Sequence, residues 1–234
     1  MNGTPAARLG VAGVLPFSSV DFPGRLAAVV FLQGCPWRCG YCHNPGLQAK
    51  GDGDGPRWPE LRHWLERRLG RLDGVVFGGG EPSLDPSLPA ALGELRELGY
   101  QLGLHTAGIA PRRLAALLPH LDWVGLDVKS SLDDEALHDR ITGLRGGLKA
   151  VRESLALLEA SGVDFECRST LHPTWFTEAD LLRLVRGLAG VPRHVLQLAR
   201  LPDAAGVPMA PIGWPSAEVL AEAKAIRPDL QLRR

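Results

Sequence analysis

Several features are scarce or missing in this sequence of 234 residues, and each absence excludes a class of protein. The chain lacks an excess of charge of either sign, because 26 Lys and Arg residues balance 26 Asp and Glu residues. This balance argues against a broad basic face for nucleic acid and against a polybasic membrane patch. No apolar run approaches the roughly 18 residues that a membrane-spanning helix requires. The first ten residues, MNGTPAARLG, contain no apolar signal core, so we expect a cytoplasmic protein with no nucleic-acid or membrane partner.

Cysteine is also scarce, with four residues in the chain, and three of them lie close together. Cys35, Cys39 and Cys42 have the spacing C-x3-C-x2-C, directly after the apolar segment LAAVVFLQ at residues 26–33. We expect this segment to form a buried strand and the cysteines to occupy the loop at its C-terminal end. Cysteines so close together on one loop are poorly placed for disulfides, and cytoplasmic thiols stay reduced. The spacing therefore favours a metal site.

The number of cysteines limits the kind of metal site. A structural zinc ion takes four protein ligands, and a cubane iron–sulfur cluster normally takes four cysteines. A loop with three cysteines would leave one iron of a cluster open to a small molecule. The alternative is zinc with His43 as the fourth ligand, although the neighbours Cys42 and His43 would have difficulty pointing at the same ion.

Segments with strand and helix patterns alternate along the rest of the chain, which predicts a parallel sheet with helices outside. Residues 50–56 (KGDGDGP) predict a flexible surface loop, and the tail from residue 202 is rich in proline before its helix. We expect an α/β fold, an incomplete (β/α)6 barrel, as a single domain over residues 1–234. The barrel would span about residues 26–200, between an N-terminal extension and a helical tail that closes one edge. The predicted strands are residues 9–17, 26–33, 75–77, 100–104, 123–128, 163–171 and 194–199; the predicted helices are residues 60–69, 87–98, 111–118, 147–160, 178–188 and 216–226.

Chemistry gathers at the C-terminal ends of strands in such folds, and the segment GGGEP (residues 78–82) follows a predicted strand. Adjacent glycines let a backbone approach a ligand closely, and the carboxylate of Glu81 could accept a hydrogen bond from an ammonium group. The alternative interpretation is a plain glycine turn.

Two later strands place polar side chains toward the barrel interior. Residues i and i+2 of a strand face the same way, so Asp127 and Lys129 would share the inner face with Val128 packed outward. Two opposite charges inside a barrel are costly unless they are paired or bind a ligand, and a structural ion pair is the alternative. On the strand 163–171, one face carries Glu166, Arg168, Thr170 and His172, whereas Cys167 points into the core.

The cysteine loop resembles that of the radical S-adenosylmethionine (SAM) superfamily, whose signature is C-x3-C-x2-C with an aromatic residue before the last cysteine, here Tyr41. The segments SVDFPGR (residues 19–25) and CHNP (residues 42–45) are similar to those of glycyl-radical-enzyme activases. The closest resemblance, over about residues 13–200, is to the activating proteins of anaerobic ribonucleoside-triphosphate reductase.

The resemblance implies the (β/α)6 fold and one [4Fe–4S] cluster on Cys35, Cys39 and Cys42, with SAM on the open iron. No further cysteines lie between Cys42 and the glycine turn, so we expect a single cluster and no catalytic residue beyond cluster and SAM. At Gln197 the chain departs from some activases, which use a histidine near this point to hold the adenine. The implied SAM contacts are Tyr41, His43, Gly79, Gly80, Glu81, Thr106, Asp127, Lys129, Arg168 and Gln197.

The reaction implied by the resemblance is activation of a partner enzyme. A low-potential donor of flavodoxin or ferredoxin type would reduce the cluster, and SAM would be cleaved to methionine and a 5′-deoxyadenosyl radical. The radical would remove a hydrogen atom from a backbone glycine of anaerobic ribonucleoside-triphosphate reductase. Alternative targets are a pyruvate formate-lyase-type enzyme or a small molecule, as in 7-carboxy-7-deazaguanine synthase. A non-catalytic iron–sulfur or zinc module would leave Glu81 and the Asp127–Lys129 pair without a role.

Overall fold

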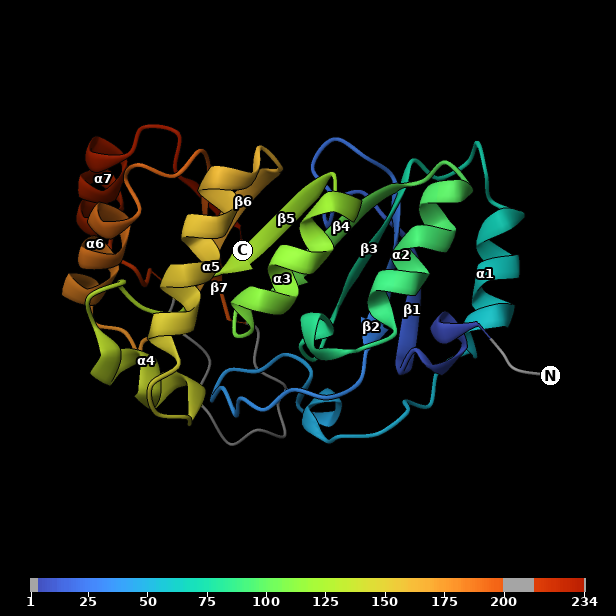
Figure 1. Ribbon diagram of the computed structural model, residues 1–234. Coiled ribbons are helices and arrows are strands. Elements are labelled where there is room, and N and C mark those ends of the chain that lie inside the picture. The colour runs from blue at the N-terminus through green and yellow to red at the C-terminus, as the bar shows by residue number, and fades with distance from the viewer. Residues whose placement is uncertain (1–3, 200–212, 234) are drawn as a thin grey trace.

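The computed structural model describes residues 4–199 and 213–233 and contains one sheet of eight strands in the order β1 to β8. Strand β1 runs antiparallel to β2, and every later pair of neighbours is parallel. Within the described residues β1 and β8 are the two free edges, so the barrel stays open (Figure 1). The strands are β1 (Val11–Ser18), β2 (Ala27–Leu32), β3 (Gly74–Gly79), β4 (Gln101–Thr106), β5 (Trp123–Asp127), β6 (Asp164–Leu171), β7 (His194–Leu198) and β8 (Gln231–Arg233).

Helices cover the outer face of the sheet. Figure 1 shows α2, α3 and α5 across the front of the strands, α1 at one end, and α6 and α7 at the other. Among the described residues, no helix is long and apolar enough to cross a bilayer. The helices are α1 (Trp58–Glu66), α2 (Leu88–Glu97), α3 (Pro111–Leu117), α4 (Glu135–Thr142), α5 (Leu148–Ser161), α6 (Glu178–Gly187) and α7 (Ala217–Ile226), with 3-10 turns η1 (Pro5–Arg8), η2 (Pro45–Gln48), η3 (Pro82–Leu84) and η4 (Leu118–His120).

The predicted fold class is confirmed, and strands β2 to β7 are the six that the sequence pattern predicts. The tail closes one edge as expected, because β8 pairs with β7. Residues 200–212, in the proline-rich stretch, lie outside the described residues. Helix α4 was not predicted, although it has both end signals: Asp134 accepts a hydrogen bond from the Leu137 N–H (2.9 Å), and Gly143 ends the helix with a φ of 67°.

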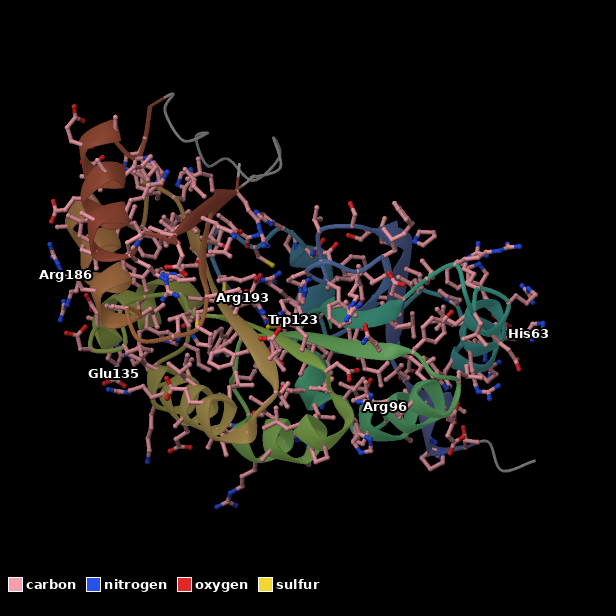
Figure 2. The ribbon with its side chains drawn as sticks, turned by 90° about the horizontal axis from the view of Figure 1, so that it is seen from above. His63, Arg96, Trp123, Glu135, Arg186 and Arg193 are labelled. Atoms are coloured by element: carbon pink, nitrogen blue, oxygen red, sulfur yellow. The ribbon has the colours of Figure 1, made fainter. Side chains whose placement is uncertain are left out.

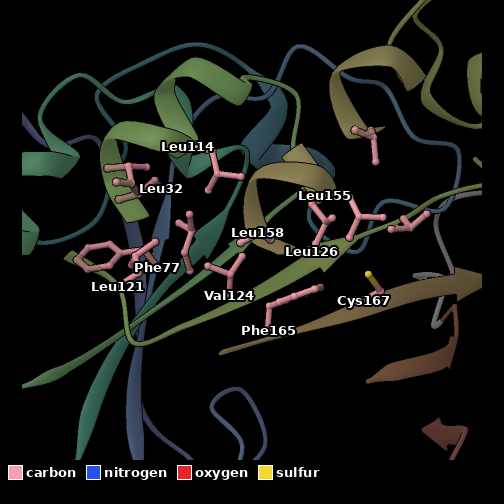
Figure 3. Close-up of a cluster of buried hydrophobic side chains, with 14 of the residues drawn as sticks. Leu32, Phe77, Leu114, Leu121, Val124, Leu126, Leu155, Leu158, Phe165 and Cys167 are labelled. Atoms are coloured by element: carbon pink, nitrogen blue, oxygen red, sulfur yellow. The ribbon is translucent and has the colours of Figure 1, made fainter. Parts of the chain in front are cut away.

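The main core lies between the sheet and its helices (Figure 3). Strand residues such as Phe77 and Leu126 meet helix residues such as Leu114 and Leu158, and all four are almost fully buried. Cys167 is buried in the same layer, as its outward position on β6 predicts. Because alternate residues of each strand fill this layer, the remaining side chains must line the inside of the barrel.

A second, smaller cluster closes the bottom of the barrel interior. Phe22 stacks on Trp123 with ring centroids 5.7 Å apart, and Ala27 and Val76 complete the cluster. Seen from above, Trp123 lies near the middle of the molecule (Figure 2). A Cβ atom at Gly74 would lie 3.0 Å from the Phe22 ring, so glycine leaves room for it. The DFPG turn therefore forms the floor beneath the interior.

The glycine-rich loop at residues 50–56 lies at the surface, as predicted, and is attached to β1. The Gly55 N–H donates to the carbonyl oxygen of Val11 (2.9 Å). A Cβ atom at Gly53 would lie 2.2 Å from the same oxygen. The glycines thus allow two backbones to pack in direct contact, which holds the loop against β1.

Candidate functional site

The cysteine loop leaves β2 at the C-terminal end of the parallel strands and is held on two sides. The Cys35 N–H donates to the carbonyl of Gln48 (3.2 Å), in the turn that follows the loop. The Arg38 N–H donates to the carbonyl of Thr142 (2.7 Å), at the C-terminal end of α4. Helix α4 therefore uses a carbonyl that has no partner inside the helix to fix the loop.

The three thiols of the loop are free and partly buried. Burial raises the pKa of Cys35 to about 11 and also raises the pKa of Cys39, so both side chains are protonated thiols before a metal binds. Binding of iron must displace their protons. In the described part of the chain, no three His, Cys, Asp or Glu side chains converge on a point that would hold one metal ion. Each cysteine of a cubane cluster binds a different iron, so the three thiols of the loop need not meet at one point.

The buried ring of Tyr41 holds the cysteine loop against Trp175. The Tyr41 ring is 3% exposed, packs edge-on against Trp175 with centroids 5.5 Å apart, and lies 5.9 Å from the Nζ of Lys129. A Cβ atom at Gly40 would lie 2.2 Å from the Trp175 ring, so this glycine is required for the contact. His43, by contrast, is exposed at the surface.

The end of β3 packs directly on the start of the cysteine loop. The Glu81 N–H donates to the carbonyl of Gly34 (2.8 Å), and a Cβ atom at Gly80 would lie 2.3 Å from that oxygen. Gly79 has a φ of 107°, in the region that favours glycine. The glycines after β3 therefore serve close backbone packing, which brings the turn beside the cysteines.

The carboxylate of Glu81 is buried and accepts four hydrogen bonds from the protein. Its Oε1 accepts from the N–H (3.1 Å) and the hydroxyl (2.6 Å) of Ser83. Thr106 Oγ1 donates to the same oxygen (2.6 Å), and the Ala107 N–H donates to Oε2 (2.8 Å). Burial raises the pKa of Glu81, and these four hydrogen bonds oppose the shift. Three of the four donors meet Oε1 and one meets Oε2, so Oε2 keeps capacity to accept a further hydrogen bond.

Asp127, Lys129 and Arg168 form a charged cluster inside the barrel, as the strand pattern predicts. Lys129 Nζ lies 3.4 Å from Asp127 Oδ2, and Arg168 Nε lies 3.5 Å from Oδ1. Burial alone would raise the pKa of Asp127, but the two cations outweigh it and hold the pKa below its usual value. Asp127 also raises the pKa of Lys129 against the opposing effect of burial. The Asp127 side chain remains 31% exposed, and its two long contacts leave acceptor capacity for a ligand.

Two further interior groups were not assigned a function from the sequence. His105 lies in contact with Arg168, with 2.8 Å between His105 Nδ1 and Arg168 Nη2. Arg233 reaches the buried carboxylate of Glu166 (3.4 Å) from β8, where its register partner is Gln197 on β7. Only the three-dimensional pairing of β8 with β7 reveals the second contact, because a strand of three residues has no sequence signal.

Comparison with protein families identifies the chain. Residues 29–185 match the family model of the radical SAM superfamily. The chain belongs to this superfamily. It is 33% identical over 188 residues to the pyruvate formate-lyase-activating enzyme of Clostridium pasteurianum, covering 78% of this chain and 77% of the relative. A protein of Methanocaldococcus jannaschii named as a glycyl-radical enzyme activating enzyme is 26% identical over 212 residues, covering 83% and 81%.

The fold comparison agrees. The crystal structure of SuiB from Streptococcus suis bound to S-adenosylmethionine superposes with a TM-score of 0.65 and 14% identity, over 86% of this radical SAM chain. The chain spans 48% of the length of that structure, so the likeness concerns the shared barrel.

Radical SAM enzymes use a [4Fe–4S] cluster and SAM, and the residues of this chain fit both groups. Cys35, Cys39 and Cys42 supply three soft thiolate ligands from one anchored loop. Beside them, the backbone at Gly80 packs directly on the start of the cysteine loop, and Asp127 and Lys129 offer charges of both signs to the polar groups of SAM.

Proposed function

We propose that this radical SAM enzyme is an activase of a glycyl-radical enzyme. The observation that carries the proposal is that the cysteine loop, the turn at Glu81 and the Asp127 cluster lie together at the C-terminal ends of the parallel strands. The names of two relatives describe them as activating enzymes, which supports a glycyl-radical enzyme as the substrate. A bound and reduced cluster would supply the electron for cleavage of SAM, and SAM would supply the group that takes a hydrogen atom from a backbone glycine of the partner.

Each group of the chain has a part in this function. The thiolates of Cys35, Cys39 and Cys42 hold the cluster, and α4 with the ring of Tyr41 keeps their loop in place. The backbone after β3 receives the methionine end of SAM, in a turn fixed by Glu81, Ser83 and Thr106.

The remaining SAM contacts are on the later strands. Asp127 and Lys129 would bind the ribose and carboxylate of SAM from the inner wall, and Arg168, which is paired with Asp127, would be a further SAM contact. Gln197 on β7 would contact the adenine. The floor of Phe22 and Trp123 closes the other end of the interior and excludes water from below. His43 lies at the exposed end of the loop, where a partner can reach it.

The partner that we propose is anaerobic ribonucleoside-triphosphate reductase, on the basis of the SVDFPGR and CHNP segments. A pyruvate formate-lyase-type enzyme is the second candidate, favoured by the 33% identity to an activating enzyme of that type. We further propose that the electron donor is of flavodoxin or ferredoxin type and that the reaction takes place in the cytoplasm, where the thiols stay reduced.

An electron paramagnetic resonance experiment tests the proposal. The protein is loaded anaerobically with iron and sulfide, reduced, and mixed with SAM and either candidate partner. We expect a glycyl-radical signal with the reductase and a much weaker one with the pyruvate formate-lyase-type enzyme. The reverse ranking would make the second candidate the partner. SAM cleavage without a glycyl radical on either protein would contradict the activase proposal and favour a small-molecule substrate.

A further inference from the structure

His105 lies between the floor of the barrel and the charged cluster. It is the fifth residue of β4, where it faces inward, and its ring packs against Trp123 with centroids 5.3 Å apart. The imidazole Nε2 lies 2.8 Å from the carbonyl oxygen of Asp21, in the DFPG turn. Nδ1 lies 2.8 Å from Arg168 Nη2. The histidine therefore joins two segments that are far apart in the sequence.

The two partners determine the tautomer. A backbone carbonyl only accepts hydrogen bonds, and a guanidinium only donates them. His105 can satisfy both only if Nε2 carries the proton and donates to Asp21, while Nδ1 accepts from Arg168. Burial, followed by the charge of Arg168, lowers the pKa of His105 to about 4, so the ring is neutral near pH 7 and Nδ1 stays an acceptor.

The contact with His105 fixes the direction of the Arg168 side chain. One edge of the guanidinium lies on the imidazole, and its Nε faces Asp127 at 3.5 Å without a hydrogen bond of its own. A Cβ atom at Gly125 would lie 3.4 Å from Arg168 Nε, so the neighbouring strand leaves room for the guanidinium and little more. In the described residues, His105 is the group that makes the shortest contact with this guanidinium.

We propose that His105 is a positioning residue for SAM, which acts through its Nδ1 by holding Arg168 against Asp127. The proposal rests on the assignment of Arg168 and Asp127 as SAM contacts. The proposal assigns a different role to each of the two hydrogen bonds of the imidazole. The bond to Arg168 sets SAM affinity, whereas the bond to Asp21 holds the floor of the barrel.

Two substitutions remove one bond each. In His105→Asn, the side-chain oxygen can take the place of Nδ1 and accept from Arg168, but no donor reaches Asp21. In His105→Gln, the side-chain N–H can take the place of Nε2 and donate to Asp21, but no acceptor remains at the Nδ1 position. Both variants lose the ring that packs against Trp123, so they are matched for that loss of packing.

The measurement is equilibrium binding of SAM to the cluster-loaded, unreduced protein, which requires no turnover. We expect His105→Asn to bind SAM within about threefold of the unmodified protein and His105→Gln to bind it about 10-fold or more weakly, because a buried hydrogen bond to a charged group is lost. The unfolding midpoint of each variant is measured alongside, to show that both are folded.

A double-mutant cycle distinguishes positioning from general packing. In an Arg168→Gln background, His105→Asn and His105→Gln should bind SAM equally, because the contact that separates them is gone. Equal binding by both variants in the unmodified background, or weaker binding by His105→Asn, would overturn the proposal. The result is independent of the proposed function, because a protein that binds SAM but activates no partner would refute the activase and leave the His105 assignment intact.

Discussion

Replacement of Gly80 by alanine tests whether the end of β3 and the cysteine loop form one packed unit. A Cβ atom there would lie 2.3 Å from the carbonyl oxygen of Gly34 and 3.0 Å from that of Leu47. Ordinary contacts of a Cβ atom begin at about 3.4 Å, so the two backbones must separate by roughly 1 Å. Neither neighbour is a flexible side chain that could rotate away.

The expected loss of stability follows from this separation. Overpacking in a close-packed interior costs about 1–3 kcal/mol. The displacement also strains two hydrogen bonds, from the Gly80 N–H to Leu32 and from the Glu81 N–H to Gly34, each 2.8 Å long. A typical hydrogen bond contributes about 1 kcal/mol. We therefore expect Gly80→Ala to lower the free energy of unfolding by about 2–4 kcal/mol.

Urea denaturation of the cluster-free protein measures this loss, and the iron-to-protein ratio after anaerobic loading shows whether the loop still binds iron. Gly93→Ala is the matched control, because Gly93 lies inside α2 with nothing within 4 Å of its Cβ position. That change should stabilise the protein by about 0.5–1 kcal/mol. A Gly80→Ala variant with unchanged stability and full iron loading would refute the packing argument.

Three other substitutions test separate parts of the account. Thr106→Val should lower the free energy of unfolding, measured in urea, by about 1.5–3 kcal/mol, because the buried Glu81 carboxylate loses a hydrogen-bond donor. Thr106→Ser keeps the hydroxyl and should lower it less. An equal loss of stability in the two variants would count against the hydrogen bond. Burial lowers the pKa of His194 to about 3, below its unfolded value near 6.5, so the unfolded state gains a proton first as the pH falls. His194→Gln should therefore flatten the pH dependence of the unfolding free energy between about pH 3 and pH 6.5, by about 1.4 kcal/mol per pH unit. An unchanged slope in denaturation experiments at a series of pH values would contradict this. Cys167→Ala should leave iron loading intact, because this thiol is buried on the outer face of β6; iron analysis showing a loss would place it in the cluster site.

The fold could be predicted from the sequence because its signals are local. Each strand from β2 to β7 is an apolar segment, or one that alternates polar and apolar residues, followed by a helix pattern. The parallel order follows from this succession of strands and helices. Helix α4 has a capping aspartate and a terminal glycine, but it is short, and Leu137 and Ile141 are its two buried apolar residues. Strand β8 is too short to give a signal.

The site could be predicted only in part, for a related reason. The spacing of the cysteines and the alternation that places Asp127 beside Lys129 are visible in one segment. The partners of Glu81 come from the turn η3 and the end of β4, and the contact of His105 with Asp21 joins residues 84 positions apart. Such contacts depend on how the strands pair in the sheet, and no local pattern encodes them.

The most direct test of the radical SAM account is formation of 5′-deoxyadenosine by the iron-loaded, reduced protein under anaerobic conditions. Cys42→Ser, which removes a proposed cluster ligand, is compared with Cys167→Ser, which alters the buried cysteine on the outer face of β6. We predict that the unmodified protein and Cys167→Ser form 5′-deoxyadenosine from SAM and that Cys42→Ser forms none. If a fully loaded and reduced protein forms no 5′-deoxyadenosine in the presence of either candidate partner, or if Cys42→Ser is as active as the unmodified protein, the central claim is wrong.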